Sequence, residues 1–382
     1  MSEKRKVVVV YLGSLYSIPP AKSLLTGLAS QDIEVYLVIT KGGINESDSL
    51  RKKITVLEVE QDYQKNVSLT RKMFRMLQLR KNLWDKIDSV YDQNTILWIT
   101  SDVAVKNLGS ELLKRRYVLQ MYELLEKSYV VPKYKFRNIH IDNYARNALR
   151  VIQPEYNRAH IVKAWWGLNK LPFILENKPF YQEIGNSRKL NVTKSAIACD
   201  VLEDLKDKKI VLYQGILHKE RPLDSFIKAI DELGSEYAFV VMSDGENLYK
   251  NVKSQNYYFI PYIEAPYHLE VTSHAYIGVL SYVPVKTSNS ILNAVYCAPN
   301  KTFEYTRFGV PMISNDVPAL DYLFEKYKCG KCIDLSSTES IKNAIKAISQ
   351  NYMEYEKNAK KYYESVDYQE KIGNLLDEVY DE

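Results

Sequence analysis

Short apolar runs alternate along this chain with longer segments in which apolar residues recur every three or four positions. Alternation of this kind predicts strands separated by amphipathic helices. In the first half we predict strands at 6–12, 33–40, 54–59, 96–100, 117–121 and 151–153, and helices at 20–30, 67–86, 101–116 and 139–149. In the second half we predict strands at 209–214, 237–242, 257–261, 275–281 and 311–314, and helices at 222–233, 301–307 and from 337 onward. This order predicts two α/β domains, each a doubly wound parallel sheet with helices on both faces.

The alternation stops between 181 and 207, where the residues are polar, charged and weakly periodic. We therefore expect an N-terminal Rossmann-like domain at 1–180, a linker at 181–207 and a second Rossmann-like domain at 208–355. Residues 356–382 are expected to form a C-terminal helix that packs back on the first domain. Because ligands bind at the carboxyl ends of the strands in such sheets, we expect the residues that follow strands to line one cleft between the domains. These residues are Gly13, Asp102, Glu123, Gly215, Asp244 and Ser281.

The composition fits a globular protein of two domains. The chain has 382 residues, of which 46% are hydrophobic and 26% charged. No uninterrupted apolar run approaches the ~20 residues of a membrane-spanning helix. The first apolar run, Val7–Leu12, is too short for the core of a signal peptide, so we expect a cytoplasmic protein.

The charge is distributed unevenly between the two halves. Residues 1–180 hold 29 Lys and Arg against 18 Asp and Glu, a surplus of +11, whereas residues 181–382 hold 23 against 29, a balance of −6. A basic N-terminal half indicates that this half faces an anionic partner, such as a membrane surface, a nucleic acid or a phosphorylated acceptor.

The segment Val67–Lys86 combines Arg and Lys with Leu, Met, Phe and Trp. A helix of this composition is typical of segments that lie on an anionic bilayer. The alternative is a domain helix whose apolar side lies in the core. Given the basic half-chain, we favour peripheral contact with an anionic membrane surface. We expect no nucleic-acid partner, because no recognised binding motif accompanies the charge.

The four cysteines do not form a disulfide framework in a chain of this length. Cys329 and Cys332 have the spacing of a redox pair or of half a zinc site, but no second such pair exists. We interpret the pair as a small turn before a strand that starts at Cys332.

The most informative segment is Asn300–Ser314, in which a short helix ends at a Gly-x-Pro and a strand follows. The N-terminus of a helix offers free N–H groups and a partial positive charge, which suit a phosphate. Lys301 adds a cation there, which is unfavourable unless an anion binds beside it. Glu304 lies one turn later on the same face and can accept two hydroxyl hydrogen bonds. A cation for a diphosphate and a carboxylate for a ribose diol indicate a nucleotide-sugar site; the alternative is a solvated pair of helix side chains.

The order of features in the second half resembles a known family. A strand that ends at Gly215, a basic loop and helix, another glycine-ended strand and a Lys-x-x-Glu before Gly-x-Pro are similar to the retaining GT-B glycosyltransferases. The nearest resemblance is to the family-four group of bacterial polysaccharide-biosynthesis enzymes, and Val151–Arg158 resembles the segment that ends their acceptor domain. The resemblance implies the GT-B fold, with two Rossmann-like domains facing an interdomain cleft.

The resemblance also implies roles for residues on the donor side. Lys301 would lie by the donor diphosphate, with Thr302 beside it in the donor site, and Glu304 would bind the ribose hydroxyls. Gly215 and Gly13 would let the backbone approach the donor closely.

The basic loop after Gly215 lies where the family keeps cations for the departing phosphates. Arg221 is the first choice for this role, because a guanidinium can bind two oxygens at once, and Lys219 is the second. Since no Asp-x-Asp metal motif is visible, we expect these cations to stabilise the leaving group without a metal or other cofactor.

The sequence departs from the family in two places. The family often has two glutamates eight residues apart, and the first of them touches the donor sugar. In this chain Tyr296 stands eight residues before Glu304, in the place of that first glutamate. The family also often has a histidine after the strand at 117–121, where this chain has Glu123. Glu123 could orient or deprotonate the acceptor hydroxyl, or it could only pair with Lys127, four residues on.

Taken together, the resemblance implies a retaining, metal-independent glycosyltransferase. It would transfer a sugar from a nucleotide donor, with UDP favoured, to a glycan that is plausibly lipid-linked and bound for capsule, lipopolysaccharide or exopolysaccharide. Two alternatives stay open: a non-catalytic subunit of the same shape that supports a partner transferase, and a sugar-nucleotide epimerase of the same architecture.

Overall fold

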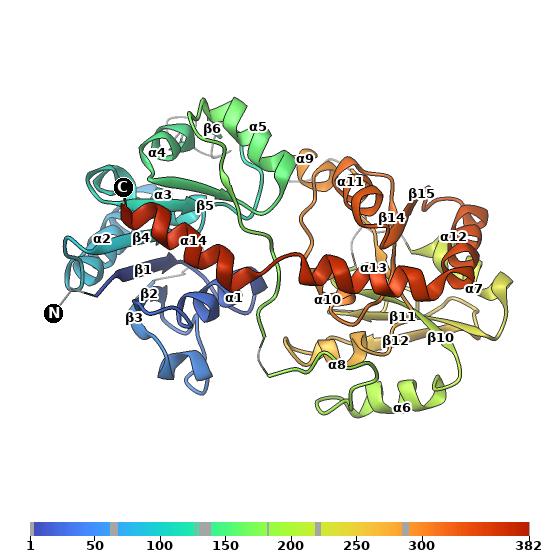
Figure 1. The fold of residues 1–382 in the computed structure, drawn as a ribbon. Helices are drawn as coiled ribbons and strands as arrows, with labels where there is room; N and C mark the ends of the chain where they lie inside the picture. The colour runs from blue at the N-terminus through green and yellow to red at the C-terminus, as the bar shows by residue number, and fades with distance from the viewer. Residues whose placement is uncertain are drawn as a thin grey trace. The chain divides into compact units, whose positions relative to one another are not determined.

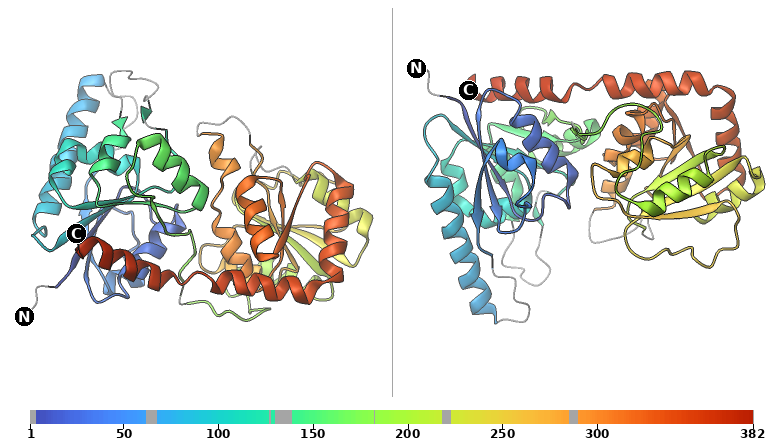
Figure 2. Two further views of the ribbon diagram at one scale, coloured as in Figure 1. Left: turned by 45° about the horizontal axis from the view of Figure 1, so that its top comes forward. Right: turned by 90° about the horizontal axis from the view of Figure 1, so that it is seen from below.

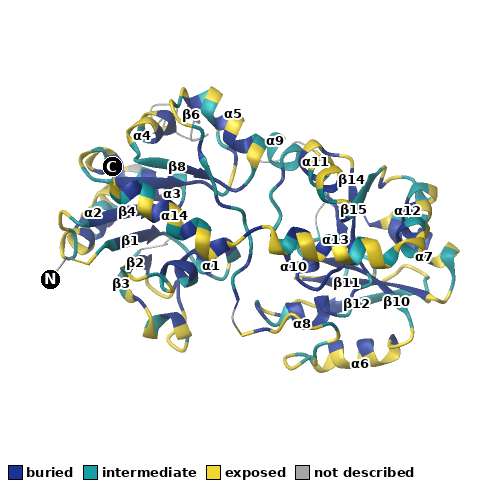
Figure 3. Ribbon diagram, in the orientation of Figure 1, coloured by how far each residue is buried: buried dark blue, intermediate teal, exposed yellow. Residues whose placement is uncertain are grey.

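The computed structural model describes residues 4–61, 68–126, 128–129, 139–181, 183–217, 223–284 and 290–381. The chain divides into two compact units (Figure 1): unit 1 comprises residues 1–176 and 367–382, and unit 2 comprises residues 177–366. Each unit contains a parallel sheet with helices on both of its faces (Figure 2). The central strands of each sheet are buried and the outer strands are mostly half-buried, and the helices alternate buried and exposed sides (Figure 3).

The sheet of unit 1 has seven strands in the order β3-β2-β1-β4-β5-β8-β9. These strands are β1 (Lys6–Tyr11), β2 (Glu34–Thr40), β3 (Thr55–Val59), β4 (Thr95–Ile99), β5 (Tyr117–Gln120), β8 (Arg150–Gln153) and β9 (Phe173–Ile174). Val7–Val10 are almost wholly inaccessible to solvent, because a central strand of such a sheet is covered on both faces. The strand order changes direction between β1 and β4, so the switch point of this sheet lies there.

The helices of unit 1 connect and cover these strands. They are α1 (Pro19–Leu28), α2 (Leu69–Asp88), α3 (Asp102–Leu108), α4 (Ile141–Asn147), α5 (Tyr156–Trp166) and α14 (Tyr368–Asp381), with the 3₁₀ turns η1 (Ser49–Lys52) and η2 (Gly109–Lys114). A short antiparallel pair, β6 (Ser128–Tyr129) and β7 (Ile139–His140), lies outside the main sheet.

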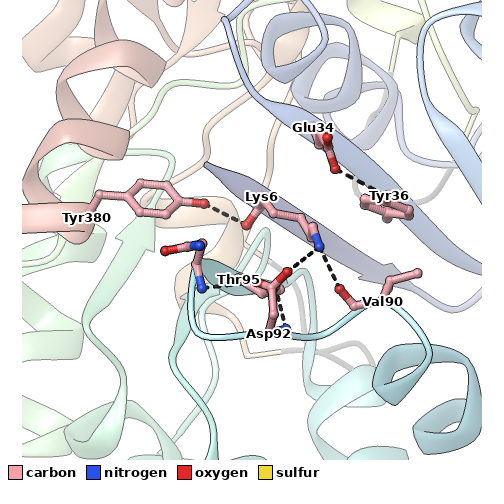
Figure 4. A network of polar contacts seen from close by, with 8 residues as sticks. Lys6, Glu34, Tyr36, Val90, Asp92, Thr95 and Tyr380 are labelled. Carbon is pink, nitrogen blue, oxygen red and sulfur yellow. Dashed lines mark hydrogen bonds and ion pairs between the residues drawn. The ribbon is translucent and has the colours of Figure 1, made fainter. Parts of the chain in front are cut away.

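The last helix, α14, belongs to unit 1 although it is at the far end of the chain. The Tyr380 hydroxyl donates a hydrogen bond of 2.6 Å to the Lys6 carbonyl at the start of β1, and the Lys6 ammonium donates to Asp92 (Figure 4). Arg116 reaches the same helix through a 3.0 Å hydrogen bond to the Val379 carbonyl. These contacts tie the C-terminus to the first strand of the sheet.

The sheet of unit 2 has six parallel strands in the order β12-β11-β10-β13-β14-β15. These strands are β10 (Lys209–Gln214), β11 (Tyr237–Ser243), β12 (Tyr257–Pro261), β13 (Ile277–Leu280), β14 (Met312–Asn315) and β15 (Gly330–Ile333). The helices are α6 (Ala196–Asp204), α7 (Asp224–Leu233), α8 (His268–Thr272), α9 (Leu292–Val295), α10 (Asn300–Thr306), α11 (Pro318–Tyr327), α12 (Thr338–Gln350) and α13 (Tyr352–Glu364). Two separate hydrophobic clusters cover the two faces of the sheet, one with side chains of α7 and α12 and the other with side chains of α6, α8, α10, α11 and α13.

The predicted strands are confirmed to within about two residues at each end, including β15, which starts at Gly330, two residues before the expected start at Cys332. Gly330 and Lys331, which were expected in a turn, are therefore part of this strand. The borders between the units differ from the expected ones. The segment 181–207, expected as a linker, belongs to unit 2 and contains α6, whose apolar side is narrow and buries only Ala198 and Leu202. The C-terminal segment forms α13 in unit 2 and α14 in unit 1.

Candidate functional site

The helix α10 forms where the sequence predicts it and positions Lys301 and Glu304. It starts after Pro299, whose backbone is extended, and β14 follows the Gly-x-Pro. Thr302 is buried, and its hydroxyl donates a 2.9 Å hydrogen bond to the Pro299 carbonyl at the start of the helix. Thr302 therefore helps to hold the helix start, and its expected role in donor binding stays a prediction.

Glu304 is a buried carboxylate, with only 6% of its surface exposed. One oxygen, Oε2, accepts a 2.6 Å hydrogen bond from the amide of Gln214, the last residue of β10. The other, Oε1, lies 3.4 Å from Nε2 of His268, the first residue of α8. A carboxylate has about four lone-pair positions, so both oxygens can accept further hydrogen bonds.

The Gln214 amide is itself fixed by a neighbour. The Thr272 hydroxyl, which is inaccessible to solvent, donates a 2.6 Å hydrogen bond to the Gln214 carbonyl oxygen. This bond turns the amide nitrogen of Gln214 toward Glu304. We call Thr272, Gln214 and Glu304 the buried polar chain; its members come from α8, β10 and α10.

The surroundings of Glu304 keep it ionised. Burial alone raises the pKa of a carboxyl, but the charge of and hydrogen bond from His268, the hydrogen bond from Gln214 and the charge of Lys301 oppose this effect. The net result is a Glu304 pKa below its ordinary value. A buried carboxylate held in this state is suited to accept hydrogen bonds from hydroxyl groups.

The Lys301 ammonium lies against two aromatic rings. Its Nζ is 4.9 Å from the ring centre of Tyr213 and 5.5 Å from that of Tyr282. Both distances fall within the range of a cation–π interaction. The positive charge beside Glu304 is thus held by the protein at the same end of α10.

These groups gather at the switch point of the sheet in unit 2. The strand order changes direction between β10 and β13, and this is where doubly wound sheets bind ligands. Gln214 ends β10, and Ser281, which is buried, follows β13. The Asn315 side chain fixes the next residue, because it accepts from the Tyr282 N–H at 2.7 Å and donates to the Tyr282 carbonyl at 2.8 Å.

One glycine follows the first strand of each sheet, as the sequence indicated. Gly13 has φ of 146° and Gly215 has φ of 125°, values that side chains of L-residues rarely allow. Gly215 also donates a 3.0 Å hydrogen bond to the Met242 carbonyl. Both positions are at the carboxyl edge of their own sheet, Gly13 in unit 1 and Gly215 in unit 2.

The other predicted site residues are distributed differently. Lys219 and Arg221 lie outside the described residues, so their roles stay predictions. Glu123 follows β5 in unit 1; burial raises the pKa of its carboxyl and the nearby Arg158 guanidinium opposes this, although part of the side chain remains exposed. Asp102 begins α3 in unit 1, and Asp244 follows β11 in unit 2. The six residues that follow strands thus divide evenly between the two units.

Three residues of this site were missed by the sequence analysis: Gln214, His268 and Thr272. A polar residue at the end of the apolar run of β10 was a usable signal for Gln214. The other two belong to α8, a helix of five residues that the periodicity did not reveal. Gln214 and Glu304 are 90 positions apart in the chain, so only the fold brings them together.

Cys329 and Cys332 are free thiols; Cys329 directly precedes β15, and Cys332 lies within it. Burial raises the pKa of Cys329 to about 12 and that of Cys332 to about 11, so both thiols stay protonated at neutral pH. Among the described residues, no group of three His, Cys, Asp or Glu side chains is arranged to hold a metal ion. Within the same residues, no helix is both long and apolar enough to span a membrane.

The structure is similar to several solved structures over almost the whole chain. HepE from Anabaena, in complex with UDP and glucose, has a TM-score of 0.67 and 12% identity, with 98% of this chain and 100% of that chain covered. Sucrose-phosphate synthase from Thermosynechococcus elongatus has a TM-score of 0.63 and 13% identity, with 99% and 96% covered. OtsA in its apo form has a TM-score of 0.67 and 9% identity, with 98% and 99% covered.

The fold is GT-B. Two doubly wound sheets in one chain, and similarity to these structures along its full length, confirm the predicted fold class. No protein-family model matches the sequence, and no curated protein matches it in sequence. At 9–13% identity the similarity shows a shared GT-B fold, and the chemistry has to be argued from the site itself.

Proposed function

We propose that this GT-B protein is a retaining glycosyltransferase that uses a nucleotide-sugar donor. The observation that carries the proposal is Glu304, a buried and ionised carboxylate at the switch point of unit 2, with the Lys301 ammonium one turn before it. A ribose diol presents two hydroxyl donors to such a carboxylate, and the diphosphate presents negative charge to the ammonium. A UDP-sugar is the favoured donor, because HepE was crystallised with UDP.

The proposed acceptor is a lipid-linked glycan in bacterial capsule, lipopolysaccharide or exopolysaccharide synthesis at the cytoplasmic face of the membrane. In the reaction, the bond between the anomeric carbon of the donor and the diphosphate oxygen breaks. The acceptor oxygen bonds to that carbon on the face from which the diphosphate leaves, and the acceptor proton passes to the leaving diphosphate. Charge builds on the diphosphate in this step, and Lys301, Arg221 and Lys219 would stabilise it without a metal.

The remaining roles follow the same scheme. Gly215 and Gly13 would allow close approach of the backbone to the donor, and Thr302 would contribute to the donor site from the start of α10. Glu123 would orient the acceptor hydroxyl from unit 1. Burial raises the pKa of its carboxyl above the ordinary value, which favours the protonated form relative to an exposed glutamate.

Glu304→Gln tests the donor site, because it keeps the size of the side chain and removes its charge. We expect affinity for a UDP-sugar to fall by about 1.5–3 kcal/mol, the usual worth of a hydrogen bond to a charged group, with a parallel loss of donor hydrolysis. Glu325→Gln is the matched control, since Glu325 is an exposed carboxylate that pairs only with Lys328 in the described ion pairs. Unchanged affinity and hydrolysis in Glu304→Gln would remove the donor assignment.

A non-catalytic subunit of the same fold is the rival reading, and Tyr296 is the observation that favours it. It directly follows α9 and lies eight positions before Glu304, where the family that the sequence resembles often carries a sugar-binding glutamate. Turnover of any UDP-, GDP-, dTDP- or ADP-sugar by the isolated chain would eliminate this rival. The products distinguish the transferase from the third alternative, a sugar-nucleotide epimerase. An epimerase returns an intact nucleotide-sugar, whereas a transferase releases the nucleoside diphosphate.

A further inference from the structure

The first half of α2 exposes large apolar side chains that the second half does not. Met73, Phe74 and Leu77 are 48%, 68% and 51% exposed, whereas Leu83 and Ile87 are wholly buried. Leu77 lies four positions after Met73 and three after Phe74, so it is a neighbour of both on the helix surface and joins the three exposed side chains into one surface. We call them the α2 patch.

The α2 patch is surrounded by positive charge. Residues 68–84 include five Lys and Arg and no Asp or Glu. Arg71, Lys72 and Lys81 are exposed beside the patch. Arg80 is different, because its guanidinium donates to the Asn107 and Lys106 carbonyls at 2.8 and 3.0 Å and so holds α2 on α3.

Arg80 and Trp84 explain why the two halves of α2 differ. The Trp84 indole N–H donates a 3.0 Å hydrogen bond to the Leu108 carbonyl at the end of α3. The second half of α2 is therefore fixed to unit 1 by both polar and apolar contacts. In the first half of α2, by contrast, the side chains of the α2 patch are exposed to solvent.

We propose that the α2 patch docks unit 1 on an anionic lipid surface. Apolar side chains flanked by exposed cations on a helix match the two layers of such a surface, the acyl region and the negative headgroups. The absence of any acidic residue between 68 and 84 removes the repulsion that the headgroups would otherwise meet. This inference concerns unit 1 alone and stands whether or not unit 2 binds a nucleotide-sugar.

Co-sedimentation of the full chain with vesicles tests the proposal. The vesicles are phosphatidylcholine alone or an equal mixture of phosphatidylcholine and phosphatidylglycerol. We expect binding to the mixed vesicles only, weakened by added salt. Arg71→Gln with Lys72→Gln should weaken binding roughly 30-fold, and Phe74→Ser with Leu77→Ser about tenfold or more.

Matched variants in unit 2 separate the patch from general charge and apolarity. Lys253→Gln with Lys357→Gln removes the same charge from exposed positions, and Met353→Ser removes a side chain that is 78% exposed. Both should bind as the wild type does. The Phe74 and Leu77 variant could melt at a lower temperature than the wild type. In that case the Arg71 and Lys72 variant alone tests the proposal, because these two side chains are exposed and their replacement should leave the melting temperature unchanged.

No binding by the wild type, or equal binding by all variants, overturns the proposal. Donor hydrolysis measured without vesicles gives an independent readout of unit 2. A chain that hydrolyses a nucleotide-sugar but ignores the vesicles disproves the lipid surface and leaves the donor site intact. A chain that binds the vesicles through the patch but shows no turnover supports the lipid surface and counts against the donor site.

Discussion

Gln214→Leu is the sharpest test of the buried polar chain, because it removes the group that holds Glu304 and leaves the carboxylate in place. The lost hydrogen bond is 2.6 Å long and has a charged acceptor. Such bonds contribute about 1.5–3 kcal/mol, and the loss is felt in full where the acceptor remains buried. Leu has nearly the volume of Gln, so little of the effect should come from a cavity.

The loss of stability should appear in unit 2. For a domain of this size, ~1 kcal/mol corresponds to roughly 2–4 °C in the melting temperature, so we expect a decrease of about 3–12 °C. Thr272→Val is the graded control: it removes only the hydroxyl that orients the Gln214 amide, and a neutral hydrogen bond contributes about 1 kcal/mol. The order of stability should be wild type, then Thr272→Val, then Gln214→Leu.

Gln214→Glu tests the direction in which stability changes with pH. It places a second carboxyl within hydrogen-bond distance of Glu304, and two such groups in a buried site share one proton. The pair then binds a proton that the unfolded chain releases above pH ~4.3, so stability is present in acid and is lost as the pH rises. Calorimetry of the three variants from pH 4 to 8 measures these effects. Equal melting temperatures for wild type and Gln214→Leu would refute the chain as a support of Glu304.

Three further predictions follow from described contacts. Because the Glu304 pKa is lowered in the fold, its contribution to stability is present above the unfolded value of ~4.3 and is lost as the pH falls through the folded value; Glu304→Gln should flatten this part of the stability curve. Deleting residues 367–382 removes five buried side chains from unit 1, each worth about 1.5–3 kcal/mol, so calorimetry should show unit 1 unfolded and unit 2 with its own transition. Cys329 and Cys332 should react slowly with iodoacetamide at pH 7.5 in the native protein and quickly after unfolding, as read by mass spectrometry, because Cys329 is buried and the raised pKa keeps the half-buried Cys332 protonated; rapid native labelling would contradict this account.

The sequence was sufficient for the fold class because the strands of both sheets are short, strongly apolar and separated by turns. Runs such as Lys209–Gln214 and Tyr257–Pro261 were predicted to the residue, since a buried parallel strand leaves an almost continuous apolar pattern. The helices α6 and α8 were missed for the opposite reason. The helix α6 buries only Ala198 and Leu202, and α8 has only five residues, too few turns for a period to emerge.

The candidate site divides along the same line. Lys301 and Glu304 are three positions apart on one helix, so their proximity could be read from the sequence. The partners of Glu304 could not, because Gln214 and His268 come from other elements and meet it only through the strand order β10–β13. A carboxylate predicted to face a ligand is therefore also part of an internal network, and that network could not be predicted from the sequence.

The basic helix shows most clearly what a pattern alone leaves undecided. The sequence places Arg71, Lys72 and Arg80 on one helix, where all three are interpreted alike as basic surface residues. The structure separates them, because Arg80 is bonded to the end of α3 while Arg71 and Lys72 remain exposed. Neutralising Arg80 should therefore lower the stability of unit 1, whereas neutralising the other two should change only what the surface attracts. Composition predicts that a helix is basic and amphipathic, but which of its turns the domain covers depends on the elements that pack against it, here α3, β2 and β3, and that is a property of the fold.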